Sequence, residues 1–163
     1  MMVKKLILLM IGGKRKRTKL IAEAFDHVLM EALPEKQAAD WEPSVLHAQL
    51  AVKLSTMNCG PTARNAEAYL KAHGMKGIEF HSLGGHFVLL DTFTGLLHDM
   101  ETYAGCKRKE ELPIWNRELA MQKAANNHQR DQIQLNFAYQ WLTQHRLNRT
   151  KSPNQRMTRP RAE

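Results

Sequence analysis

The sequence predicts an α+β protein in which helices pack on one small antiparallel sheet. A helical run begins at Cys59 and ends near Gly74, three short strand-like runs follow it, and the pattern becomes helical again at Pro113. The strand-like runs cover residues 78–81, 86–90 and 96–99. Short apolar runs separated by turn residues are typical of an antiparallel meander. A helix followed by such a meander, with further helices after it, predicts the α+β class.

The chain of 163 residues has the length of one domain with its own buried core. Its apolar content of 43% and charged content of 25% are typical of a globular protein. We expect a single domain over residues 1–147. Residues 148–163 contain two prolines and show no apolar periodicity, which predicts a basic, disordered tail.

The first residues admit two interpretations. We expect residues 3–11, which include the apolar run 6–11, to form a buried strand, with Gly12, Gly13 and the basic residues 14–17 in the loop that follows. The alternative is a targeting segment or membrane anchor, because two lysines precede the apolar run. Its six consecutive apolar residues are too few to span a bilayer, and no small-x-small cleavage site follows them. The glycines also lack the spacing of a phosphate-binding loop.

Four further helices follow from apolar spacing and from residues that start or stop helices. Thr18 is expected to cap the first of them and Pro34 to end it, while Pro113 opens the third. Residues 34–44 are expected to form a linker. The four expected helices cover residues 18–33, 45–54, 113–125 and 129–145.

The net charge of +8 is concentrated at the two ends. Residues 1–19 and 144–163 together hold 13 of the 24 Lys and Arg but one of the 16 Asp and Glu, so residues 20–143 hold 11 basic and 15 acidic side chains. A nucleic-acid-binding core is therefore not predicted, although the basic ends are suited to nonspecific contact with a polyanion.

Two cysteines, Cys59 and Cys106, are too few for a disulfide framework or a zinc knuckle. They indicate a reduced, cytoplasmic protein. We expect Cys106 to be an exposed thiol in a loop, with a disulfide to Cys59 as the alternative.

Cys59 lies where the helix of the central segment should begin. The first turn of a helix stabilises a thiolate through its free N–H groups and its dipole, and the thiolate is the nucleophilic form of cysteine. Gly60 permits close approach of other groups, and Pro61 is preset for a first turn. These features predict a nucleophilic cysteine.

A nucleophilic thiol needs a base that is oriented by a third group. His86 opens an apolar strand after two glycines, and Asp99 ends the next strand, where an antiparallel neighbour could bring it beside His86. His81 is the alternative base and Asp91 the alternative acid. We prefer Asp99 because strand alternation points Asp91 away from His86, and the same alternation points His98 away from Asp99.

Residues 59–63 (Cys-Gly-Pro-Thr-Ala), residues 84–90 (Gly-Gly-His-Phe-Val-Leu-Leu) and the acid that ends the next strand together resemble papain-like cysteine peptidases. The similarity is greatest to the bacteriocin-leader-processing and transglutaminase-like branches, and covers about residues 55–105. It implies a helix that carries the nucleophile Cys59, packed on a small antiparallel sheet that carries the base His86 and the orienting acid Asp99. It implies no cofactor.

One position departs from the family. A glutamine that donates to the oxyanion usually precedes the cysteine by about six residues, and Lys53 stands there in this chain. Asn58 and Gln49 are the candidates to replace it. Removal of one oxyanion donor typically lowers the rate about a hundred- to a thousand-fold.

The sequence thus predicts a cysteine hydrolase or acyltransferase that acts on a peptide or amide bond through an acyl-enzyme, with a peptide or protein as substrate and no membrane span. The alternative is a non-enzymatic interaction protein on the same papain-like fold, whose basic ends dock on nucleic acid or another anionic partner. A small secreted or membrane-bound factor is a third, weaker alternative.

Overall fold

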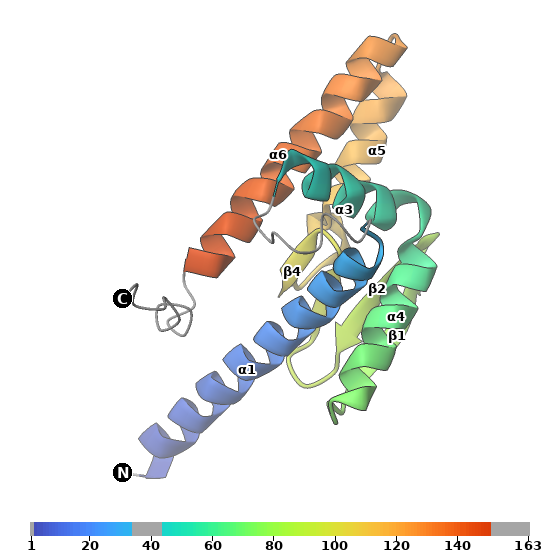
Figure 1. Ribbon diagram of the computed structural model, residues 1–163. Helices are drawn as coiled ribbons and strands as arrows, with labels where there is room; N and C mark the ends of the chain where they lie inside the picture. Colours follow the sequence, from blue (N-terminus) through green and yellow to red (C-terminus); the bar gives the residue numbers. More distant parts are fainter. Residues whose placement is uncertain (1, 34–43, 151–163) are drawn as a thin grey trace, which may run out of the picture.

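The computed structural model describes residues 2–33 and 44–150, and the side chains of residues 13–33 and 44–145 (Figure 1). The helices before the sheet are α1 (Met2–Glu31), α3 (Val45–Met57) and α4 (Cys59–Ala72). The strands are β1 (Ile78–Leu83), β2 (His86–Asp91), β3 (Leu96–Asp99) and β4 (Thr102–Cys106). A short 3-10 helix, η1 (Lys109–Glu111), leads to α5 (Pro113–Lys123) and α6 (Asn127–Thr150).

The four strands form one antiparallel sheet in the order β1-β2-β3-β4, so the predicted α+β class and meander are confirmed. The fourth strand, β4, was not predicted. Its sequence, Thr-Tyr-Ala-Gly-Cys, lacks clear apolar alternation, and it follows β3 after only two residues. Pairing with β3, rather than local preference, makes it a strand.

The two faces of the sheet are covered by different helices. Phe80, Phe87 and Leu89 belong to the main core, which also takes in α1, α3, α4 and α6. Val88 and Leu97 point to the other face and pack with Leu112, which follows η1, and with the start of α5. Strand β2 is therefore covered on both faces, with α4 on one side and the start of α5 on the other.

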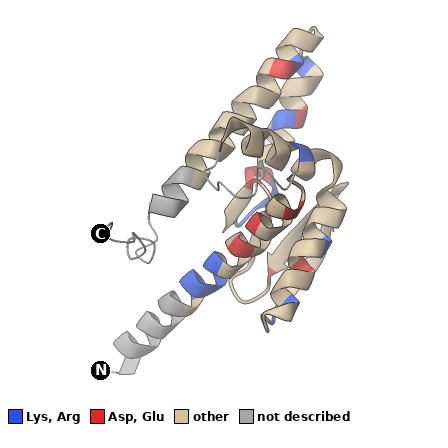
Figure 2. Ribbon diagram, in the orientation of Figure 1, with Lys and Arg blue, Asp and Glu red and all other residues tan. Residues whose placement is uncertain are grey.

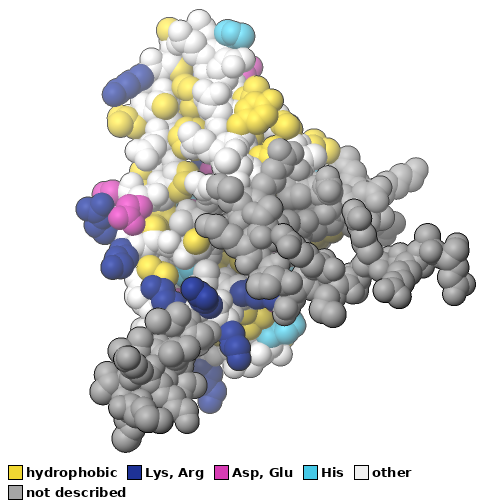
Figure 3. Space-filling model, turned by 90° about the vertical axis from the view of Figure 1, so that its left-hand side faces the viewer, with side chains coloured by type: hydrophobic (Ala, Val, Ile, Leu, Met, Phe, Trp, Pro, Cys, Tyr) yellow, Lys and Arg dark blue, Asp and Glu magenta, His cyan; other side chains and the backbone are white. Residues whose placement is uncertain are grey.

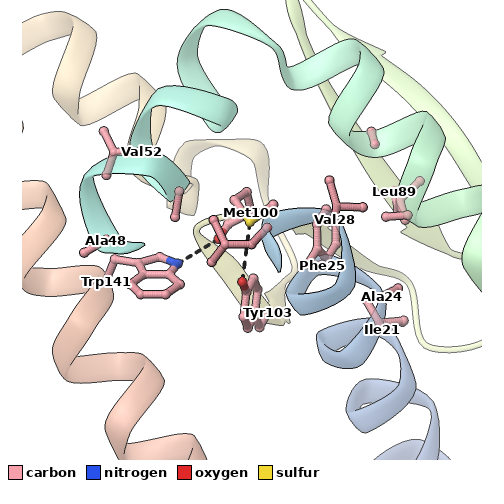
Figure 4. Close-up of a cluster of buried hydrophobic side chains, with 14 of the residues drawn as sticks. Ile21, Ala24, Phe25, Val28, Ala48, Val52, Leu89, Met100, Tyr103 and Trp141 are labelled. Atoms are coloured by element: carbon pink, nitrogen blue, oxygen red, sulfur yellow. Dashed lines mark hydrogen bonds between the residues drawn. The ribbon is translucent and has the colours of Figure 1, made fainter. Parts of the chain in front are cut away.

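The main core is closed by aromatic side chains around the turn between β3 and β4 (Figure 4). The indole N–H of Trp141 donates to the carbonyl oxygen of Met100 at 2.9 Å, and the hydroxyl of Tyr103 donates to the Met100 sulfur at 3.4 Å. Phe25 of α1 stacks on Tyr103 with 5.8 Å between ring centroids. Helices from both ends of the chain thus meet at this turn.

The predicted strand over residues 3–11 and the loop after it are wrong, because α1 runs unbroken from Met2 to Glu31. Thr18 consequently lies inside the helix and does not cap it. Leu, Met, Lys and Arg are good helix formers, and each internal glycine costs only about 1 kcal/mol. A short apolar run alone does not separate strand from helix.

The remaining helix predictions are confirmed for α3, α5 and α6, with ends that shift by a few residues. Ser44 caps α3 through its hydroxyl, which accepts from the His47 N–H at 3.4 Å. Of the expected linker, residues 34–43 lie outside the described residues, as do residues 151–163 of the expected tail. The tail was expected to begin at residue 148, but residues 148–150 belong to α6. No helix in the described part of the chain is long and apolar enough to cross a membrane.

The charges on α1 are segregated, with Lys and Arg at residues up to 19 and Asp and Glu from residue 23 onward (Figure 2). Arg17 is the one cation of the described basic stretch that reaches the sheet. Its Nη2 lies 2.6 Å from an oxygen of the buried Asp91, and also donates to the Lys76 carbonyl oxygen at 2.8 Å. Burial alone would raise the pKa of Asp91, but the hydrogen bonds from Arg17 and the Phe93 N–H hold it below its ordinary value of 3.8.

Replacing Arg17 with leucine should lower the free energy of unfolding by about 2–3 kcal/mol, because Asp91 would be left buried without its cation. Urea unfolding at neutral pH measures this change. The matched control is Lys19→Ala, which removes an exposed pair with Glu23 and should cost less than about 1 kcal/mol. Equal costs for the two variants would show that the Arg17 contact does not hold α1 to the sheet.

Candidate functional site

Cys59 is the first residue of α4, as the sequence predicts, and its side chain is half-buried. Asn58 alone separates it from the last residue of α3, and the Asn58 carbonyl oxygen accepts from the Thr62 N–H at 2.9 Å. The N–H groups of Cys59 and Gly60 precede this first helical bond, so they have no partner within α4. Pro61 lies in the same turn, where its missing N–H costs nothing.

His86 and Asp99 form a buried pair at one end of the sheet. His86 Nε2 lies 2.9 Å from Asp99 Oδ2, and the two residues are 1% and 3% exposed. The β2–β3 ladder runs from Leu89–His98 to Asp91–Leu96. The His86–Asp99 side-chain bond therefore lies just beyond the Leu89–His98 end of this ladder. His86 is the first residue of β2, after the glycine turn that joins β1 to β2.

This bond determines which nitrogen of His86 is available as a base. An ionised carboxylate only accepts hydrogen bonds, so Nε2 carries the proton and Nδ1 carries the lone pair. Nδ1 is buried and has no hydrogen-bond partner among the described residues. The imidazole thus has a free acceptor atom at its second nitrogen.

Cys59, His86 and Asp99 line one crevice at this end of the sheet. It is too narrow to hold a water molecule. The Phe87 ring packs against Gly60, where an added Cβ would lie 3.4 Å from it. Strand alternation therefore directs His86 away from the α4 face of β2, and the crevice connects it to Cys59 around the end of the sheet.

The turn that carries Asp99 is fixed by charged groups. The Glu101 N–H donates to Asp99 Oδ1 at 2.9 Å, so both carboxylate oxygens of Asp99 are bonded. Arg117 of α5 donates to the Glu101 carboxylate at 2.5 and 2.8 Å, and to the Thr56 hydroxyl at 2.8 Å. Burial raises the pKa of Glu101, and the paired guanidinium opposes that effect.

Trp115 of α5 covers His86 on the face of the sheet that is opposite α4. The two rings meet edge-on, with centroids 6.2 Å apart and an interplanar angle of 81°. An indole at this position limits the access of water to the His86–Asp99 bond, which is stronger in a low-dielectric environment.

The alternative base and acid lie elsewhere. His81 is exposed and pairs with Glu79 at 3.0 Å, while Asp91 binds Arg17. His98 points to the main-core face, opposite to Asp99, and its Nδ1 lies 3.0 Å from the Tyr103 carbonyl oxygen. A Cβ at Gly105, whose φ is +79°, would lie 2.5 Å from the His98 ring, which explains the glycine there.

The prediction for Cys106 is wrong. It ends β4 and is buried, with its thiol donating to the Arg108 carbonyl oxygen at 3.3 Å. Burial, with the negative charges of Asp99 and Glu111 nearby, raises the pKa of Cys106 to about 11. Both cysteines are free thiols, so the structure contains no disulfide between them.

Neither oxyanion candidate lines the crevice. Asn58 is exposed between α3 and α4, and Gln49 lies with Lys53 in a separate groove between α3 and α6. The free N–H groups of Cys59 and Gly60 are the donors nearest to the thiol in the chain. Helical spacing from Cys59 could have pointed to Ser55 and Thr62, which line the crevice.

No protein-family model, curated protein or solved structure matches this chain. Within residues 13–33 and 44–145, no group of three His, Cys, Asp or Glu side chains is placed to hold a metal ion. The site is therefore interpreted from its own geometry.

The free energy of unfolding should fall as the pH rises from about 9 to 11. In that range the folded protein keeps the Cys106 proton that the unfolded chain has already lost, so each step upward favours unfolding. The loss should be roughly 2 kcal/mol, and Cys106→Ala should abolish this part of the pH dependence. Urea unfolding at several pH values measures it, and an unchanged alkaline slope in Cys106→Ala would contradict the assignment.

Proposed function

We propose that the protein is a papain-like cysteine hydrolase or acyltransferase that acts on a peptide or amide bond. Cys59 is the nucleophile, His86 the general base and Asp99 the acid that orients the imidazole. The observation that carries this proposal is the buried His86–Asp99 hydrogen bond, which leaves Nδ1 without a hydrogen-bond partner among the described residues, in a crevice shared with Cys59.

The proposed reaction begins when the Cys59 thiol gives its proton to His86 Nδ1. The thiolate attacks the carbonyl carbon, and the N–H groups of Cys59 and Gly60 donate to the oxyanion that forms. As the carbon–nitrogen bond breaks, the protonated His86 gives its proton to the leaving amine, which leaves a thioester on Cys59. Water or a second nucleophile, deprotonated by His86, then attacks the thioester and releases the Cys59 thiolate, which recovers its proton.

Asp99 supports this sequence without exchanging a proton. Its carboxylate holds the imidazole in the Nε2–H tautomer and stabilises the imidazolium that forms during the reaction. The Glu101 N–H and the Arg117–Glu101 pair in turn hold Asp99 in place. These contacts are suited to keeping a base fixed inside the protein.

Cys59 should react with iodoacetamide at pH 6 much faster than Cys106, because its thiolate is stabilised by the first turn of α4 and by an imidazolium, whereas Cys106 stays protonated. His86→Ala should slow the labelling of Cys59 about tenfold or more, and Asp99→Asn should slow it less. Mass spectrometry of labelled peptides over time measures both rates.

The matched control is His81→Ala, which removes an exposed imidazole from the neighbouring strand and should leave the rate unchanged. Circular dichroism verifies that each variant is folded. Equal labelling of the two cysteines, or no effect of His86→Ala in a folded protein, would make Cys59 an ordinary thiol.

That outcome would favour the second candidate, a non-enzymatic interaction protein. The observation behind it is the exposed basic stretch of α1, which contains Lys14, Arg15, Lys16 and Lys19. Lys and Arg side chains gather on the lower part of the face drawn in Figure 3. Such a stretch is suited to counterion-releasing contact with a polyanion.

A further inference from the structure

A groove of about 530 Å³ lies between α3 and α6. This volume is within the range of about 300–1,000 Å³ that is typical of ligand sites. The crevice at Cys59, in contrast, has no room for a substrate beside the thiol. A polypeptide that reacts at Cys59 therefore needs a binding surface outside that crevice.

The groove adjoins the helical turn that precedes the candidate nucleophile in the chain. Thr56 and Met57, in the last turn of α3, line the groove, while Ser55 in the same turn lines the crevice. Asn58 then joins Met57 to Cys59. The last turn of α3 thus contributes residues to both cavities, and Met57, which lines the groove, precedes Cys59 by two residues in the chain.

The groove walls offer the two kinds of contact that an extended peptide uses. Gln49, Gln132 and Gln134 supply amide donors and acceptors, which match the N–H and C=O groups of a peptide backbone. Val52, Met57 and Leu135 add apolar surface, and Met57 is 71% exposed. Apolar surface with a few polar groups is the usual lining of a binding site.

Two charged side chains of the groove have no ion-pair partner among the described residues. Lys53 comes from α3 and Asp131 from α6, and both side chains are exposed. Neither makes an ion pair of 4 Å or less with a residue in the described part of the chain. A ligand that carries both signs of charge would complement this arrangement.

We propose that this groove binds an extended segment of a polypeptide substrate, with a carboxylate against Lys53 and a basic side chain against Asp131. The bound segment presents a neighbouring amide bond to Cys59. This assignment rests on the proposed function, because it treats Cys59 as the acceptor of the acyl group.

The test uses the full chain with Cys59→Ala, which binds without reacting, and a displayed library of random 12-residue peptides. The tightest peptide is synthesised with a fluorophore and titrated by fluorescence polarisation. Lys53→Glu and Asp131→Lys should each weaken its binding tenfold or more. The controls Lys123→Glu and Glu118→Lys make the same charge changes at exposed positions of α5 outside the groove, and should alter binding less than twofold.

Failure to select any binding peptide, or equal binding by the parent, Lys53→Glu and Asp131→Lys proteins, would overturn the groove assignment. Lys53 and Asp131 are exposed, so folded variants are expected, and thermal melts verify this. Iodoacetamide is small enough to reach Cys59 without the groove. His86-dependent labelling without peptide binding would reject the groove alone, whereas groove-dependent peptide binding without His86-dependent labelling would reject the proposed reaction alone.

Discussion

The arrangement of the site depends on one buried ion pair, between Arg117 of α5 and Glu101 in the turn after β3. Taking two charges out of water is costly, and the geometry must be good to offset that cost. Here the guanidinium binds both oxygens of Glu101 and the Thr56 hydroxyl, so one side chain joins α5, α3 and the β3–β4 turn. The turn is held from a second direction by Trp141, which donates to the Met100 carbonyl oxygen. The backbone that carries Asp99 is therefore fixed by two C-terminal helices.

A fixed Asp99 determines the state of His86. Because the Glu101 N–H occupies one carboxylate oxygen, the other is directed to His86 Nε2, and the imidazole must present Nδ1 as its acceptor. The half-buried thiol at the start of α4 lines the same crevice. This arrangement separates the tasks of the chain, since α4 supplies the proposed nucleophile, the sheet supplies the proposed base and acid, and α5 and α6 hold the turn after Asp99 in place. The groove between α3 and α6 lies next to this site.

Local patterns predicted the parts of the fold that depend on local interactions. Three of the four strands and the start of α4 at Cys59 follow from apolar spacing and turn residues. The first part of α1 did not, because a short apolar run suits both a strand and a helix. Cys106 was wrongly expected in an exposed loop, because its burial depends on the pairing of β4 with β3 and not on its neighbours in the sequence. Arg117 and Trp115 carry no sequence signal for their roles, since their partners lie 16 and 29 residues away in the chain. The His86–Asp99 pairing was predictable because one short turn separates the two strands.

The tautomer of His86 tests the central claim most directly. Long-range proton–nitrogen correlation spectra of the Cys59→Ala protein, assigned with His86→Gln, report which ring nitrogen carries the proton. The account predicts a proton on Nε2 and a lone pair on Nδ1, and a change at Nδ1 when the Cys59 thiol is restored. A proton on Nδ1 in Cys59→Ala, or identical His86 signals with and without the thiol, would contradict it.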